Sequence, residues 1–251
     1  MGREWPVNGG WTGWPGTGAG ETGGMRVSGV DGCRGGWASA EVEVGEDGPA
    51  GAVAVRVAGS LGELLADTAV GQVVGIDMPL GLLASGWRAA DGEARRRLGV
   101  RRSSIFAIPP ASVWEQADYQ AALAECRRVT GQGFSIQAWG LRPKLLEAGE
   151  YRRQGRQRLY EVHPELSFAC LAGAPLPEPK HRPAGQEVRR SLLAAAGLEI
   201  PDDPAWRRAA ADVLDAAAVA WTAGRIAAGR ATVLPDPPQA GQDGREIAIR
   251  F

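Results

Sequence analysis

Hydrophobic and polar residues alternate in the first regular part of the chain. Val27–Asp31 is a short apolar run, Trp37–Val44 alternates apolar and polar residues, and Ala52–Val57 carries valine at every second position. A period of two is typical of half-buried strands. Glycine-containing turns separate the three runs, so the pattern predicts three consecutive antiparallel strands.

A helix and a fourth strand follow. Ser60 and Glu63 have the spacing of a capping box, which predicts a helix from this point to about Ala69. Gln72–Asp77 is an apolar run closed by Pro79. Since strand–helix–strand units are right-handed with parallel strands, we expect the fourth strand to be parallel to a neighbour in the sheet.

Longer periodic segments predict the rest of the fold. Helices are expected at Ala89–Leu98, Tyr119–Thr130, Pro143–Gly149, Glu187–Ala196 and Ala205 to about Gly229, and strands at Leu159–Val162 and Arg245–Phe251. This order is that of the ribonuclease-H-like fold. We therefore predict one α/β domain over residues 25–251, with a mixed sheet of three antiparallel and two parallel strands flanked by helices. A helical insertion at about 82–156 precedes the fifth strand.

Composition excludes several classes of protein. Residues 1–24 hold nine of the 36 glycines and follow no period, which predicts a disordered Gly/Trp-rich tail or, alternatively, a segment that docks on a partner. The net charge of −1 provides no long-range attraction for polyanions. Only Lys144 and Lys180 among the 28 basic residues are lysine, so the arginine excess is interpreted as compositional. Without a long apolar run or a signal pattern, we expect a cytoplasmic protein without a membrane segment.

Acidic residues end two of the predicted strands. Asp31 closes the first strand and Asp77 closes the fourth. If these strands are parallel neighbours, both carboxylates lie at the sheet edge where ligands of open α/β sheets bind. Burying a carboxylate without a partner is costly, which favours a functional interpretation. The alternative is that each aspartate caps a turn.

Asp212 and Asp215 lie three residues apart in an apolar part of the last predicted helix. This spacing places both on one helix face. Two like charges about 5 Å apart cost about 3 kcal/mol at an effective dielectric near 20, and a divalent cation would offset this cost. The alternative is a pair of exposed acids neutralised by Arg208 and nearby arginines.

A further polar cluster contains Glu161, His163 and Glu165. Either glutamate could add a metal-binding oxygen, whereas His163 could equally be a structural hydrogen-bonding residue. Oxygen ligands select Mg²⁺, Mn²⁺ or Ca²⁺ rather than zinc. Two such ions, about 3.5–4 Å apart, can activate water and stabilise the leaving oxygen of a phosphodiester. Candidate phosphate-binding groups elsewhere are Arg102, Ser103, Ser104, Gln137 and Lys144, with a solvated loop as the alternative.

Six sequence blocks in order resemble the domain of unknown function 429 family of predicted ribonuclease-H-like nucleases. These blocks are 27–37, 75–82, 101–106, 134–139, 160–165 and 212–216. The resemblance implies a ribonuclease-H-like core and a nuclease activity that uses a divalent metal. It implies an acidic centre at Asp31, Asp77 and the Asp212/Asp215 pair, with the 101–104, 135–144 and 161–165 blocks lining a pocket.

These observations predict a Mg²⁺- or Mn²⁺-dependent nuclease or phosphodiesterase. Asp31, Asp77 and Asp215 would hold the metal, with Asp212 or Glu161 as a fourth carboxylate, and the substrate would be nucleic acid or a small phosphoester. A non-catalytic binding or regulatory module with the same fold is the main alternative. A small-molecule phosphotransferase is less favoured, because proteins of that group need two copies of this domain.

Overall fold

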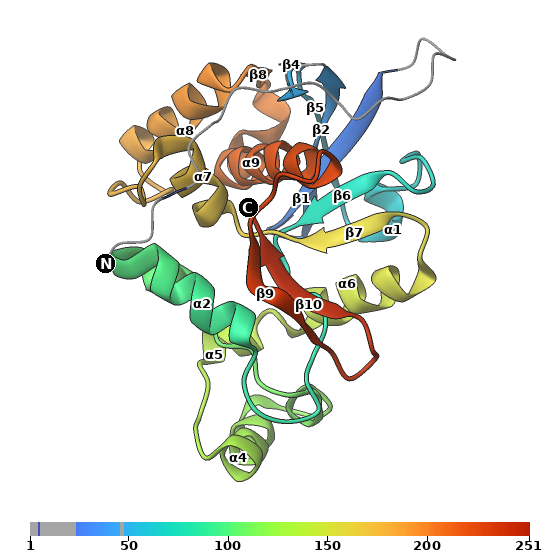
Figure 1. The fold of residues 1–251 in the computed structure, drawn as a ribbon, viewed down its shortest axis with the longest axis vertical. Coiled ribbons are helices and arrows are strands. Elements are labelled where there is room, and N and C mark those ends of the chain that lie inside the picture. The colour runs from blue at the N-terminus through green and yellow to red at the C-terminus, as the bar shows by residue number, and fades with distance from the viewer. Residues whose placement is uncertain (1–4, 6–23, 46–47) are drawn as a thin grey trace. The chain divides into compact units, whose positions relative to one another are not determined.

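The computed structural model describes Trp5, residues 24–45 and residues 48–251 (Figure 1). These residues form two compact units. The first comprises the described residues up to Asp77, Gly155–Thr232 and Arg250–Phe251, and the second comprises Met78–Gln154 and Val233–Ile249. The predicted insertion at 82–156 therefore coincides closely with the main segment of the second unit. Except for Trp5 and Gly24, the predicted tail lies outside the described residues.

A mixed sheet forms the centre of the first unit, which confirms the predicted fold class. Its strand order is β3-β2-β1-β6-β7, with β5 also paired to β2. The strands are β1 (Met25–Cys33), β2 (Gly36–Gly45), β3 (Gly48–Pro49), β5 (Ala54–Ala58), β6 (Val73–Ile76) and β7 (Arg158–Glu161). As predicted, β1, β2 and β5 are antiparallel neighbours, whereas β6 is parallel to both β1 and β7. The two-residue β3 was not predicted, since it is too short to show a period.

Helix α9 (Ala210–Ala227) packs against β1, β2 and β6 (Figure 1). A Cβ atom added to Gly29 would lie 2.1 Å from Ala216 O, and one added to Gly75 would lie 2.7 Å from Val219 Cγ1. The helix backbone thus approaches the sheet so closely that only glycine fits at these positions. Because side chains alternate along a strand, Asp31 and Asp77, two residues beyond these glycines, lie on the same sheet face as α9.

The predicted helix from Ala205 is interrupted near its start. A 3₁₀ turn spans Pro204–Ala209, and Trp206 has the non-helical angles φ −114° and ψ 17°. Trp206 is buried against Cys33, Ala38 and Val213. Packing of this large ring at the sheet therefore takes precedence over a continuous helix.

Helix α1 (Leu61–Leu64) begins as predicted but ends early. Ser60 Oγ accepts a hydrogen bond from Glu63 N, and Glu63 Oε2 accepts one from Gly59 N, both at 3.2 Å. The chain beyond Leu64 bonds to another loop instead of extending the helix, since Thr68 O accepts from Gln157 Nε2 at 3.0 Å. The prediction of a helix to Ala69 was therefore wrong at its C-terminal end.

Prolines open two helices of the first unit. Pro164 was expected only to end a strand, but it is the first residue of α7 (Pro164–Ala172). Likewise α8 (Pro183–Ala195) begins at Pro183, before the predicted start at Glu187. Proline is favoured at the first helical position because its missing N–H would have no intrahelical partner there. The remaining short strands of this unit, β4 (Gly51–Ala52) and β8 (Leu198–Glu199), pair with each other.

The second unit is mainly helical. Its predicted helices α2 (Ala89–Leu98) and α4 (Tyr119–Thr130) have the expected bounds. The other elements are α3 (Ala111–Trp114), α5 (Ile136–Trp139), α6 (Arg142–Gln154), the 3₁₀ turn Gly99–Ser104 and the paired strands β9 (Val233–Ala240) and β10 (Glu246–Arg250). The core includes the stacked rings of Trp114 and Trp139, whose centroids lie 6.0 Å apart.

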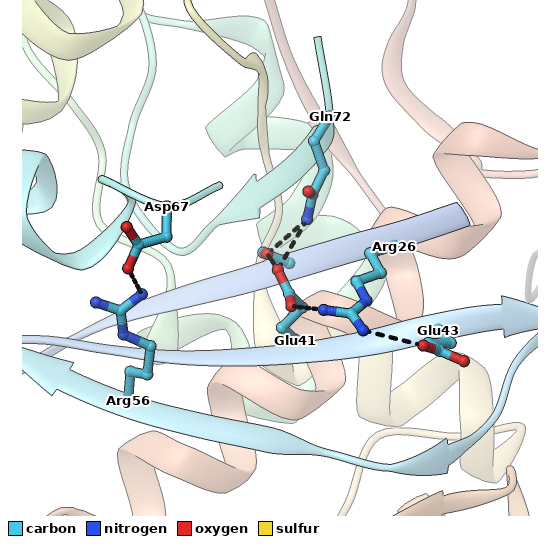
Figure 2. A network of polar contacts seen from close by, with 7 residues as sticks. Arg26, Glu41, Glu43, Arg56, Asp67 and Gln72 are labelled. Atoms are coloured by element: carbon cyan, nitrogen blue, oxygen red, sulfur yellow. Dashed lines mark hydrogen bonds and ion pairs between the residues drawn. The ribbon is translucent and has the colours of Figure 1, made fainter. Parts of the chain in front are cut away.

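A polar network joins the beginning of β1 to β2 and to the entry of β6 (Figure 2). Arg26 pairs with Glu41 at 3.3 Å and with Glu43 at 3.1 Å. Gln72 Nε2 donates to Ser28 Oγ at 3.0 Å and to Glu41 Oε2 at 3.3 Å. This network lies at the opposite end of β1 from the strand-terminal aspartate. Its exposed ion pairs each add little stability, because solvent screens them.

Candidate acidic site

The parallel pairing of β1 and β6 brings Asp31 and Asp77 together. Val30 and Ile76 are register partners, and Asp77 N donates to Val30 O at 2.8 Å. The two aspartates therefore occupy matching positions at the carboxyl ends of neighbouring strands. Burial raises the pKa of Asp77, although the nearby charges of His163 and Lys180 oppose this shift.

Asp31 carries the strongest electrostatic penalty of the site. It is only 5% exposed, and its pKa is raised well above the usual value, first by burial and then by the charges of Asp77 and Asp215. A raised pKa favours the protonated form of the Asp31 carboxyl group, and a cation bound there would oppose that shift.

Asp215 lies in α9, near Asp31 and Asp77, and pairs with Lys180. Lys180 Nζ lies 2.5 Å from Asp215 Oδ2, and the Asp215 side chain is 2% exposed. Burial raises the pKa of Asp215 to about 6, although Lys180 opposes this shift. Burial lowers the pKa of Lys180, but Asp215, Asp31 and Asp77 raise it by more, so the lysine stays positively charged.

Two carboxylate oxygens in this group are buried without a hydrogen-bond partner among the described residues. They are Asp31 Oδ2 and Asp215 Oδ1. A buried acceptor normally has a partner, and leaving one unsatisfied costs about 1–3 kcal/mol. These oxygens therefore have free capacity for a cation or a donor from a ligand.

The two remaining carboxylate candidates for this centre are placed differently. Asp212 is half-buried and close enough to raise the pKa of Asp31. Glu161 is the register partner of Ile76, so its side chain lies on the opposite sheet face from Asp77. Val162 instead occupies the α9 face, where its Cγ2 would be 3.1 Å from a Cβ at Gly75. The structure groups Asp31, Asp77 and Asp215, with Asp212 nearby, and it does not bring Glu161 to them.

His163 and Glu165 follow β7 and take different positions. His163 is half-buried and near enough to lower the pKa of Asp77. Glu165 is buried in α7, and its Oε1 accepts from Arg189 Nη2 at 2.6 Å. Its carboxylate is therefore one partner of an internal ion pair.

The other predicted phosphate-binding residues all belong to the second unit. Arg102 and Ser103 are exposed in the 3₁₀ turn, where Ser104 Oγ donates to Arg101 O at 2.9 Å. Gln137 is exposed on α5, and Lys144 is half-buried on α6. Their role in substrate binding stays a prediction.

Sequence reasoning missed Lys180, which lies in a proline-rich loop without any period. A usable signal existed, because Lys180 is one of only two lysines in a chain rich in arginine. Arg189 was also missed: it is 1% exposed and donates to Glu178 O, Gly185 O and Glu165. It thereby ties α8 to the loop that carries Lys180.

A family model described as "Protein of unknown function (DUF429)" matches residues 29–240. This range contains the three grouped aspartates and Lys180. The chain belongs to the DUF429 family. The match confirms the family resemblance found in the sequence. Neither a search of the curated proteins nor a search of the solved structures found a match.

The described residues of this DUF429 protein contain no group of three or more His, Cys, Asp or Glu side chains that could hold a metal ion as placed. The neighbouring carboxyl groups of Asp31 and Asp77, with the unpartnered Oδ2 of Asp31, still suit a hard cation. No helix in the described part of the chain has the length and apolar character needed to cross a bilayer.

Proposed function

We propose that this DUF429 protein is a phosphodiesterase or nuclease that uses Mg²⁺ or Mn²⁺ at the acidic site. The observation that carries the proposal is the convergence of Asp31, Asp77 and Asp215 from three distant segments at one end of the sheet. Within the described residues, the ammonium group of Lys180 pairs with one of them, Asp215, at hydrogen-bond distance. A buried excess of negative charge favours binding of a cation.

The donor atoms support the choice of ion. Asp31 and Asp77 offer carboxylate oxygens, which Mg²⁺ and Mn²⁺ prefer to nitrogen or sulfur. The buried Oδ2 of Asp31 already lacks a partner, so an ion would satisfy it without breaking another bond. Asp31 and Asp77 would hold the ion, and because the pKa of Asp31 is raised, a proton on Asp31 would leave as the ion binds.

A divalent cation supplies Lewis-acid polarisation of a phosphoryl oxygen and lowers the pKa of water. The side chains of this chain position the charge and orient the ligands. Asp31 and Asp77 fix the position of the charge, and Lys180 holds Asp215 in one orientation. His163 adds a titratable group near Asp77. The substrate is a nucleic acid or a small phosphoester.

The proposal includes the ribonuclease-H-like assignment and a cytoplasmic location. Three antiparallel strands followed by two parallel strands, with α9 packed on the sheet, are the elements expected for that fold.

The cysteines support the proposed location. All three, Cys33, Cys126 and Cys170, are buried free thiols. Free cysteines are typical of proteins from reducing compartments.

A non-catalytic binding module is the second candidate, and a specific observation favours it. Asp215 pairs with Lys180, and Glu165 pairs with Arg189. Carboxylates that are matched by internal cations can serve structure alone. Binding of Mn²⁺ separates the two candidates, because a purely structural cluster has no need of an ion.

Hydrolysis assays test the proposal directly. The full chain is screened against single- and double-stranded DNA and RNA and small phosphodiesters, with Mg²⁺, Mn²⁺ or EDTA. Asp31→Asn is expected to lose at least about 100-fold of the metal-dependent rate. The matched control, Asp67→Asn, changes an aspartate whose side chain is 83% exposed and should keep the rate. Equal rates in Asp31→Asn and wild type would reject the proposed role.

A further inference from the structure

The loop before α8 places one lysine inside the acidic site. Lys180 is the only one of the chain's two lysines in the first unit, and its Nζ contacts Asp215 Oδ2. The same ammonium is near enough to Asp31 and Asp77 to lower the pKa of both. A single fixed positive charge thus lies among three carboxylates that come from β1, the end of β6 and α9.

Close packing fixes the path of this loop. A Cβ atom at Gly185 would lie 2.1 Å from Pro179 O, so the first turn of α8 touches the residue next to Lys180. Arg182 N donates to Pro179 O at 3.1 Å. Packing of the loop against α8 therefore fixes the backbone position of Lys180.

Arg189 holds the same loop in place through hydrogen bonds to backbone oxygens. Its Nη1 donates to Glu178 O at 3.1 Å and to Gly185 O at 3.0 Å, and its Nη2 bonds to Glu165. Glu165 pairs with Arg189, and its charge still raises the pKa of Asp77 and Asp215. Lys180 instead contacts the aspartate cluster directly, through Asp215.

The charges of the cluster favour one divalent ion over two. Three carboxylates and one ammonium leave two negative charges, which one divalent ion neutralises. Two ions would leave an excess of positive charge beside the half-buried ammonium of Lys180. Asp212 is half-buried and near enough to raise the pKa of Asp31, whereas Glu161 lies on the other sheet face. The position beside Asp215 Oδ2 is already taken by the ammonium.

We propose that Lys180 is a permanent internal cation that takes the place of a second metal ion. Its ammonium holds Asp215, and Asp31 and Asp77 bind a single divalent ion. This differs from the two-ion arrangement expected from the sequence. The inference rests on the proposed metal site and specifies its stoichiometry.

The number of bound Mn²⁺ ions per chain tests this inference without any assay of activity. We expect calorimetric titration of the full wild-type chain to give one ion. Lys180→Met removes the ammonium, and we expect that variant to bind two ions. Lys180→Arg keeps the charge and should bind one. Arg182→Met removes an exposed charge from the same loop and should also bind one.

Electron paramagnetic resonance gives an independent readout. Two neighbouring Mn²⁺ ions are spin-coupled, so the coupled spectrum should arise in Lys180→Met and be missing in the wild type. Far-UV circular dichroism checks that the variant is folded, and Lys180→Gln serves as a second, polar replacement if Lys180→Met unfolds.

The outcomes separate this inference from the proposed function. Two ions in the wild type, or one ion in the folded Lys180→Met and Lys180→Gln variants, would overturn the role of Lys180 and leave the metal site standing. No ion in the wild type would overturn the metal site itself, and with it both proposals.

Discussion

Asp31 and Asp77 occupy matching positions on parallel neighbouring strands, where Asp77 N donates to Val30 O at 2.8 Å. Burial of the two acids side by side raises the pKa of both. A bound cation opposes that shift, so the arrangement has consequences for pH dependence, stability and metal affinity that can be measured.

Metal affinity is expected to rise with pH. The pKa of Asp31 is raised, first by burial and then by Asp77 and Asp215, so a proton competes with the ion at low pH. Mn²⁺ should bind more tightly at pH 8 than at pH 5.5, and binding should release a proton in the lower part of this range. Calorimetry in two buffers of different ionisation enthalpy measures both effects. An affinity that is constant over this range would contradict the prediction.

Replacing Asp31 should stabilise the metal-free protein at neutral pH. A raised folded-state pKa means that ionisation costs stability as the pH rises above the unfolded pKa near 3.9. Asp31→Asn avoids this cost. Urea denaturation in EDTA should show a higher free energy of unfolding than wild type at pH 7 and a smaller gain at pH 4. A loss of stability at pH 7 would show that the carboxylate is structural.

The Arg189–Glu165 ion pair should behave as a buried structural unit. Arg189→Met leaves the Glu165 carboxylate buried without its partner, which should cost about 3–5 kcal/mol. Exchanging both residues for apolar ones should recover much of this loss. Denaturation of the single variant and of the Arg189→Met/Glu165→Leu variant measures the difference. If the single and the double variant were equally stable, burial of the unpaired Glu165 carboxylate would not be the cause of the loss.

Close packing of α9 on the sheet predicts a severe effect at Gly29. The added methyl of Gly29→Ala would meet Ala216 O at 2.1 Å, so we expect a loss of at least about 3 kcal/mol. Gly149→Ala is the matched control, because a Cβ there meets nothing within 4 Å in α6. That change should raise stability by about 0.5–1 kcal/mol. Thermal unfolding of both variants provides the comparison.

The sequence predicted those parts of the fold that have a clear period or a local cap. Alternation identified β2 and β5, short apolar runs identified β1 and β6, and the ends of these two runs then located Asp31 and Asp77. The sheet face of Glu161 could not be predicted, because a shift of one residue in register moves a side chain to the other face. Strand β9, Val233–Ala240, was missed because it contains three prolines, which sequence patterns usually associate with loops.

The position of Lys180 could not be predicted for a different reason. It depends on contacts between a loop without a period and the first turn of α8. The helix itself was predicted to begin later than it does, since Pro183 was assigned to the loop. Long-range packing of Gly185 on Pro179 and of Arg189 on Glu165 then fixes the loop, and no local pattern contains that information.

The most direct test of the account is a calorimetric Mn²⁺ titration of the wild-type chain, Asp31→Asn and the exposed control Asp67→Asn at pH 7.5. We predict that wild type and Asp67→Asn bind Mn²⁺ with equal affinity. Asp31→Asn should bind at least about 100-fold more weakly, which corresponds to about 2.7 kcal/mol. Absence of Mn²⁺ binding in the wild type, or equal affinity in all three proteins, would contradict a metal site at Asp31 and Asp77.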